Sequence, residues 1–221
     1  MLPFAMAALA VIVAAGISWM IWRTSRSYVA IAAIVLLMAG QLTASLLVGQ
    51  LLLAGRPPLM LPLMLVVIAC TLYAALSEIG GRMAIGFSFA WLIGFQCFRL
   101  PLELVMHQAA VSGIMPEQMT FTGDNFDILT GITALIVAWL ASKGKAPRWL
   151  LIAWNAMGSV LLIIIVGIAG ASLPMFAAFG PDKLNTWVAD PPYIWLPGVL
   201  VQAALFGHIV IWRKLFFTKP E

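Results

Sequence analysis

The sequence predicts an all-α integral membrane protein, a single domain over residues 1–221 that forms a bundle of seven transmembrane helices. Three observations predict this fold. The chain is 63% hydrophobic and only 9% charged, whereas soluble domains carry about 25% charged residues. Its mean hydropathy is +1.06. Short polar breaks divide the chain into apolar runs that approach the length of about 20 residues that a transmembrane helix needs.

The apolar runs follow one another closely and leave no room for a sizeable soluble domain. The first has no Lys or Arg before it and is too long for the apolar part of a signal peptide, so we expect it to stay in the mature protein. Several tryptophans fall at the ends of runs, as anchoring at the membrane interface requires. The predicted spans are 2–22, 28–53, 58–76, 83–106, 128–140 with its flanks, 149–168 and 193–212.

Basic residues are distributed unevenly over the breaks between these spans. The breaks after the first, third and fifth spans and the C-terminal tail hold nine of them, whereas the alternate breaks hold only Arg56 and Lys183. The positive-inside rule then places the N-terminus outside and the C-terminus in the cytoplasm, so the net charge of +4 indicates membrane anchoring and no nucleic-acid partner. The nine are Arg23, Arg26, Arg82, Lys143, Lys145, Arg148, Arg213, Lys214 and Lys219.

The fourth predicted span carries ionisable residues inside an apolar run. Gln96, Arg99, Glu103 and His107 are spaced by three, four and four residues, which places them on one face of a helix. Arg99 and Glu103 have the spacing of an ion pair within a helix. Counted from the cytoplasmic end, Arg99 should lie in the outer part of the span and His107 near the outer interface.

The segment 115–129, which follows this span, is unusually apolar and aromatic for a solvated loop. We therefore expect it to fold back against the bundle. Asp124, Asn125 or Asp127 can cap the next helix by accepting hydrogen bonds from its first free amides. Asp124 or Asp127 can alternatively return to Arg99 and form a polar cluster with it.

Two interpretations of this polar stripe are open. Ionisable residues within a span usually mark function, and an outward-facing pocket would bind a small anionic or amphiphilic molecule, or a lipid headgroup, through Arg99. Alternatively, the ion pair of Arg99 and Glu103 is structural and locks the fourth span to its neighbours. The predicted pocket residues are Gln96, Arg99, Glu103, His107, Asn125 and Asp127.

Other classes of function use the same residues. An intramembrane enzyme would use Glu103 or His107 as general base, with Arg99 stabilising developing negative charge. A secondary transporter would open alternately to the cytoplasm past Gln202 and His208, and a structural or assembly protein would have no cavity. We expect His208 near the cytoplasmic end, in a different layer from Arg99.

Known catalytic and cofactor patterns are absent from the sequence. The last span, 193–212, has no lysine for a retinal Schiff base. No two potential metal ligands have an established spacing, so no metal is predicted. No protease, esterase or diphosphate motif occurs, and the sequence identifies no cofactor.

Several motifs resemble a family of small bacterial multi-span membrane proteins to which no activity is assigned. The resemblance covers the second half of the chain best, and it implies residence in the bacterial inner membrane without adding a mechanism. The family commonly has an acidic residue at the position of Thr122 and a basic one at that of Asp124, so an ion pair in this loop is not carried over. The motifs are 98–103 (FRLPLE), 119–129 (MTFTGDNFDIL), 154–155 (WN), 195–197 (WLP) and His208.

Overall fold

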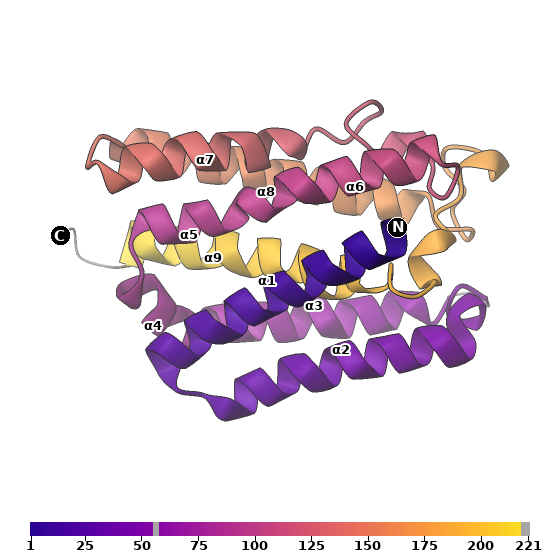
Figure 1. Ribbon diagram of the computed structural model, residues 1–221, viewed down its shortest axis with the longest axis horizontal. Helices are drawn as coiled ribbons and strands as arrows, with labels where there is room; N and C mark the ends of the chain where they lie inside the picture. The colour runs from indigo at the N-terminus through magenta and orange to yellow at the C-terminus, as the bar shows by residue number, and fades with distance from the viewer. Residues whose placement is uncertain (55–57, 218–221) are drawn as a thin grey trace.

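The computed structural model describes residues 1–54 and 58–217, and this part of the chain is a helical bundle (Figure 1). Short 3-10 turns connect the helices, and a π-helical turn, η6 (Leu196–Leu200), leads directly into the last one. Arg56 and Lys219, which the charge count includes, lie outside the described residues. The α-helices are α1 (Leu2–Ser25), α2 (Tyr28–Val48), α3 (Met60–Leu76), α4 (Glu78–Gly86), α5 (Phe89–Phe95), α6 (Arg99–Val111), α7 (Ile128–Ser142), α8 (Arg148–Ala171) and α9 (Val201–Phe217).

Within these residues, five helical segments are long and apolar enough to cross a bilayer: α1, α2, α5 with α6 (Phe89–Val111), α8, and η6 with α9 (Leu196–Phe217). The helices α3 and α4 add a sixth if they form one span that is bent by 54°. The apolar helix α7 has 15 residues, fewer than the usual length of a straight span. The all-helical membrane fold is confirmed, whereas the count of seven spans and the orientation stay predictions.

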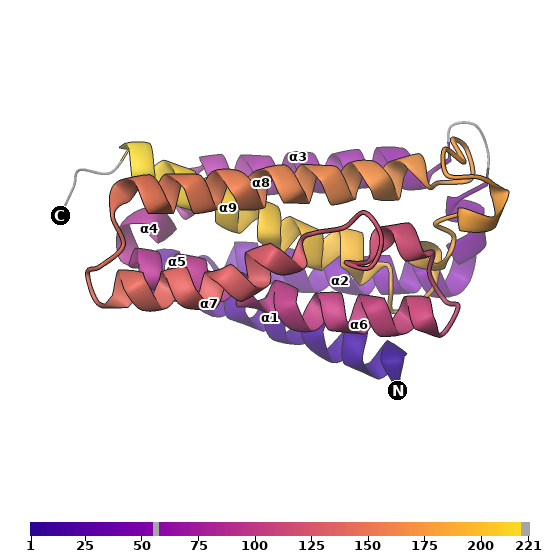
Figure 2. The same cartoon turned by 90° about the horizontal axis from the view of Figure 1, so that it is seen from above.

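The two ends of the bundle carry different connections (Figures 1 and 2). The N-terminus and the loops 112–127 and 172–195 lie at one end, called here the N-terminal end, and the turns at 26–27 and 143–147 lie at the other. The loop 112–127 returns along the bundle before α7 begins, and Met119 within it is 2% exposed. The predicted fold-back is confirmed, and α7 begins only after this loop, at Ile128.

The last helix, α9, is the core of the bundle and packs against α3, α4, α5 and α8. Near its end, Nη1 of Arg213 donates to the carbonyls of Ala75 and Ser77, both at 2.6 Å. Nζ of Lys214 donates to the carbonyl of Ala84 at 3.0 Å. The last carbonyls of a helix lack partners within the helix and carry partial negative charge. Arg213 therefore caps the C-terminal end of α3, and Lys214 caps that of α4.

The predicted fourth span, 83–106, is wrong at both ends. Met83 belongs to α4, and the backbone becomes extended at Phe87 and Ser88. The hydroxyl of Ser88 accepts a hydrogen bond from the Trp91 amide at 3.4 Å and so caps the start of α5. The span therefore runs over Phe89–Val111.

Candidate functional site

A buried polar network joins four helices near the middle of the bundle. The guanidinium of Arg99, at the start of α6, contacts both carboxylate oxygens of Asp127, the residue before α7, with Nε 2.6 Å from Oδ2. Its Nη1 lies 2.8 Å from Nε2 of His208 on α9. Nδ1 of His208 in turn lies 2.7 Å from Oδ1 of Asn155 on α8. None of the four residues is more than 4% exposed.

The chemistry of arginine determines the proton positions in this network. A guanidinium can only donate, so Nε2 of His208 accepts from Arg99, and Nδ1 carries the proton that is donated to Asn155. Nδ2 of Asn155 donates back to the His208 carbonyl at 3.1 Å. Gly158 of α8 leaves room for the imidazole, because a Cβ there would lie 2.9 Å from Nε2 of His208. The network therefore ties α6, α8, α9 and the start of α7 together.

Two expectations about this network differ from the structure. Arg99 forms its ion pair with Asp127 and not with Glu103, so the return of a loop carboxylate to Arg99 is the alternative that the structure contains. The placement of His208 in a different layer is wrong. The spans Phe89–Val111 and Leu196–Phe217 both lie later in the sequence than predicted, so Arg99 and His208 each fall near the middle of their span.

The Glu103 side chain is 2% exposed, and its one hydrogen-bond partner among the described residues is Asn125. Nδ2 of Asn125 lies 2.9 Å from each carboxylate oxygen of Glu103. The same nitrogen donates to the carbonyl of Met119 at 3.0 Å, and Oδ1 of Asn125 accepts from the amide of Asp127 at 3.0 Å. Asn125 therefore fastens the loop 112–127 to α6 and orients Asp127.

The two ends of the predicted polar stripe lie outside this network. His107 is half-buried, and its ring lies against that of Phe121 with centroids 4.6 Å apart. Gln96 is buried, and its Nε2 donates to the carbonyl of Ala204 at 3.3 Å. Neither residue lines the cavity that Glu103 faces. Of the two general bases that the enzymatic alternative offers, Glu103 lines this cavity together with Arg99, and His107 does not.

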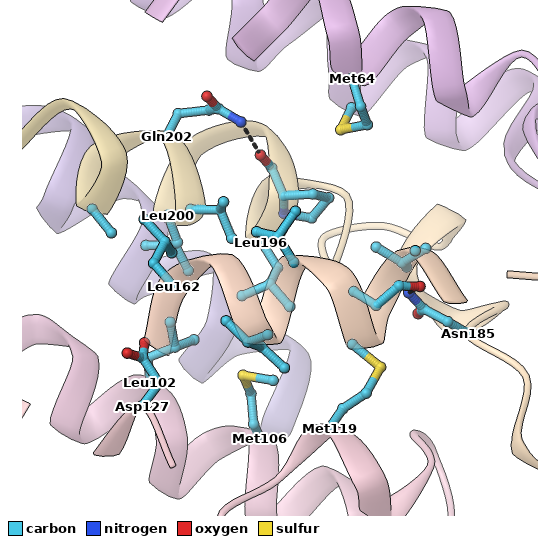
Figure 3. Close-up of a pocket in the computed structure, with 18 of the residues that line it drawn as sticks. Met64, Leu102, Met106, Met119, Asp127, Leu162, Asn185, Leu196, Leu200 and Gln202 are labelled. Atoms are coloured by element: carbon cyan, nitrogen blue, oxygen red, sulfur yellow. Dashed lines mark hydrogen bonds between the residues drawn. The ribbon is translucent and has the colours of Figure 1, made fainter. Parts of the chain in front are cut away.

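An apolar cavity lies between α3, α6, α8 and α9 (Figure 3). Its volume is about 320 Å³, within the range of about 300–1,000 Å³ that is typical of small-molecule sites. The polar part of its wall comes from Arg99, Glu103, Asp127, Asn185 and Gln202, and the rest is formed mainly by aliphatic side chains and methionines. Figure 3 shows Asn185 and Gln202 far apart along the cavity, which is therefore elongated.

The cavity reaches the outer surface of the bundle between α3 and α8. Leu65 of α3 and Val166 of α8 line it, and they are also 66% and 38% exposed. Each of them lies five residues from the N-terminal end of the bundle, counted from Met60 and Ala171, which is about 8 Å along a helix. Leu65 and Val166 therefore line the cavity and also form part of the outer surface of the bundle.

Sequence reasoning missed Asn155 and Asn185 as site residues. Asn185 lies in the loop 172–195, where its Nδ2 donates to the carbonyl of Ala169 at 3.1 Å. A signal was available for Asn155, because a lone amide inside an apolar span needs a polar partner on another helix and His208 is available. Asn185 carries no such signal, since polar residues are ordinary in a loop.

Comparison of the chain with protein-family models, curated protein sequences and solved structures found no match. Within residues 1–54 and 58–217, no group of three or more His, Cys, Asp or Glu side chains is arranged to hold a metal ion. The fold and the site together define a polytopic membrane protein with a buried ionic network beside an apolar cavity.

Proposed function

We propose that the protein binds the hydrocarbon chain of a membrane amphiphile in the cavity between α3 and α8. The observation that carries this proposal is the exposure of Leu65 and Val166, which line an apolar cavity and also face the surroundings. Apolar walls with a few placed polar groups are typical of sites for small amphiphilic molecules. The Arg99 network supports the wall of this site, because each of its guanidinium nitrogens contacts Asp127 or His208.

Gly170 of α8 offers a direct test of the cavity. It lines the cavity, and a Cβ built on it meets no atom within 4 Å. Gly167, one turn earlier in the same helix, is equally open but does not line the cavity. Gly170→Phe should therefore fill the cavity, whereas Gly167→Phe should place the same ring outside it.

The probes are a fatty alcohol and a fatty acid, each with a diazirine in its chain, added to the protein in phosphatidylcholine nanodiscs. After illumination, peptide mass spectrometry should locate adducts on Met106 and Met119 in the wild type and in Gly167→Phe. Gly170→Phe should lose these adducts for whichever probe binds. Adducts confined to surface residues such as Leu36 and Leu47 in all three proteins would contradict the proposal.

We also propose seven spans in a bacterial cytoplasmic membrane, with α3 and α4 as one broken span, α7 as a short span and the N-terminus outside. The excess of basic residues in alternate breaks supports this orientation. In a variant without Cys70 and Cys97, a cysteine at Ser112 should react with an impermeant maleimide on intact cells. A cysteine at Lys143 should react only after permeabilisation, and the reverse pattern would overturn the orientation.

A further inference from the structure

A second hollow lies on the outer surface of the bundle, where α1, α5 and α7 face the surroundings. Among these helices, α5 lies between α7 and α1 (Figure 1). The volume of the hollow is about 470 Å³, which also falls in the range of about 300–1,000 Å³ that is typical of small-molecule sites. No charged residue lines it. We call it the tryptophan groove, after Trp19, Trp91 and Trp139 in its walls.

The three tryptophans come from three different helices. Trp19 of α1, Trp91 of α5 and Trp139 of α7 are 43%, 58% and 57% exposed. The rings of Trp19 and Trp91 lie 5.7 Å apart, and both pack on Phe87, at 5.8 and 6.3 Å between centroids. Anchoring at the membrane interface explains why each ring lies near the end of a span. It does not explain why rings from three helices line one hollow.

Small residues keep the space between these rings open. Gly16, Ala90, Gly94 and Ala138 line the groove and extend little or nothing into it. A Cβ on Gly16 would lie 2.9 Å from the ring of Phe95, and a Cβ on Gly94 would lie 3.5 Å from the Cβ of Ala138. The groove is therefore apolar, open to the surroundings and bordered by flat aromatic rings.

The groove lies at the end of the bundle with the turns 26–27 and 143–147, called here the basic end. Trp91 is two residues from the start of α5, Trp139 is three from the end of α7, and Trp19 is six from the end of α1. The tryptophans therefore lie within about 9 Å of this end, and Gly16, nine residues from the end of α1, lies at about 14 Å. The groove thus extends from the end of the bundle toward its middle.

Eight basic residues of the described part of the chain lie at the basic end. Five of them contact an ion-pair partner, an aromatic ring or backbone carbonyls within the protein. The other three, Arg23, Lys143 and Lys145, are exposed and form no side-chain hydrogen bond or ion pair with the residues that the structure describes. The five with partners are Arg26, Arg82, Arg148, Arg213 and Lys214.

The three free cations lie beside the tryptophan groove. Arg23 follows Trp19 by four residues, so both lie on the same face of α1. Lys143 directly follows Ser142, which lines the groove at the end of α7, and Lys145 lies in the same turn. Cations therefore stand at the α1 edge and at the α7 edge. In the described residues, Glu78 is the one carboxylate at this end, and it pairs with Arg82.

We propose that the tryptophan groove binds an anionic phospholipid. One acyl chain lies between the tryptophan rings over α5, and the phosphate group lies at the basic end, between Arg23 and Lys143. Each Lys or Arg near the surface attracts an anionic lipid by electrostatics, and these cations have no competing carboxylate. A zwitterionic lipid carries its own cation and gains less. The site is separate from the cavity between α3 and α8 and does not depend on its function.

The test compares two lipids that differ only in their headgroup. Phosphatidylglycerol or phosphatidylcholine, each with the same diazirine-bearing acyl chain, is added in trace amounts to the whole protein in phosphatidylcholine nanodiscs. After illumination, the tryptic peptide 83–99 contains all of α5, and its fragments locate adducts on residues 90–95. Relative to adducts on Leu36 and Leu47 of α2, the glycerol lipid should exceed the choline lipid roughly tenfold, as expected for two cations near an anion.

Matched charge variants locate this preference. Arg23→Gln combined with Lys143→Gln should lower the ratio at residues 90–95 at least threefold. The control combines Arg26→Gln with Arg82→Gln, which removes the same charge from the same end but from side chains that contact Trp22 and Glu78. It should change the ratio by less than twofold. All four positions are exposed, so the comparison does not depend on repacking of the core.

A steric variant tests the place of the chain. Ala90→Phe should fill the groove and remove the adducts on residues 90–95, whereas Ala33→Phe, on the exposed face of α2, should leave them. Equal labelling by both lipids in the wild type would overturn the anionic preference, and an equal effect of the two charge variants would overturn its location. If both lipids labelled α2 but neither labelled residues 90–95, the groove would be no lipid site, and a protein helix would be its occupant.

Discussion

Arg99→Met should lower the free energy of unfolding by about 3–5 kcal/mol, the usual cost of removing one partner of a buried ion pair. The variant leaves the carboxylate of Asp127 in an apolar interior without its cation. It also removes the hydrogen bond that Nη1 of Arg99 donates to Nε2 of His208 over 2.8 Å. The measurement is reversible unfolding in mixed micelles with increasing denaturing detergent, followed by circular dichroism.

Two further proteins make this result specific to the buried pair. The double variant Arg99→Met with Asp127→Leu should recover most of the loss, because apolar replacement of both partners is often neutral or stabilising. The control, Arg82→Met, breaks an ion pair with Glu78 whose side chains are 54% and 84% exposed, and it should change stability by about 1 kcal/mol or less. Equal effects of Arg82→Met and Arg99→Met would contradict a dominant role for the buried pair.

Gly131→Ala should destabilise the protein by about 3 kcal/mol, at the upper end of what overpacking of a core usually costs. A Cβ on Gly131 of α7 would overlap the amide nitrogen of Leu100 and lie 2.9 Å from its Cα and 3.0 Å from the carbonyl carbon of Arg99. These are backbone atoms at the start of α6, and they cannot move aside without shifting Arg99 away from Asp127. Thermal unfolding in detergent micelles measures the effect.

Gly94→Ala is the matched control, because Gly94 lies in α5, which also packs against α7. A Cβ on Gly94 would meet the Cβ of Ala138 at 3.5 Å, an ordinary contact. Alanine is a better helix former than glycine, and nothing clashes with it here. Gly94→Ala should therefore raise the free energy of unfolding by about 0.5–1 kcal/mol. If Gly131→Ala also stabilised the protein, the close approach of α7 to α6 would be refuted.

The membrane class was predictable from the sequence, because apolar runs of span length have few other stable environments than lipid. The stripe of Gln96, Arg99, Glu103 and His107 was also predictable as one helix face. It was not predictable that only Arg99 and Glu103 of this stripe line the cavity. The depth of each residue in the bundle depends on where α5 begins, and a single cap at Ser88 determines that start. A shift of a few residues in a span moves each side chain several ångströms in depth.

By itself, the sequence determined that the chain is helical, that it belongs in a membrane, and that Arg99 needs a partner, since a buried charge is too costly alone. It offered that partner as Glu103 or as a loop carboxylate. Only the tertiary structure decided for Asp127, joined His208 and Asn155 to Arg99, and left Glu103 facing an apolar cavity beside Leu65 and Val166. The physical reason is that local spacing determines which residues share a helix face, whereas pairing between helices depends on how whole helices pack in depth and rotation.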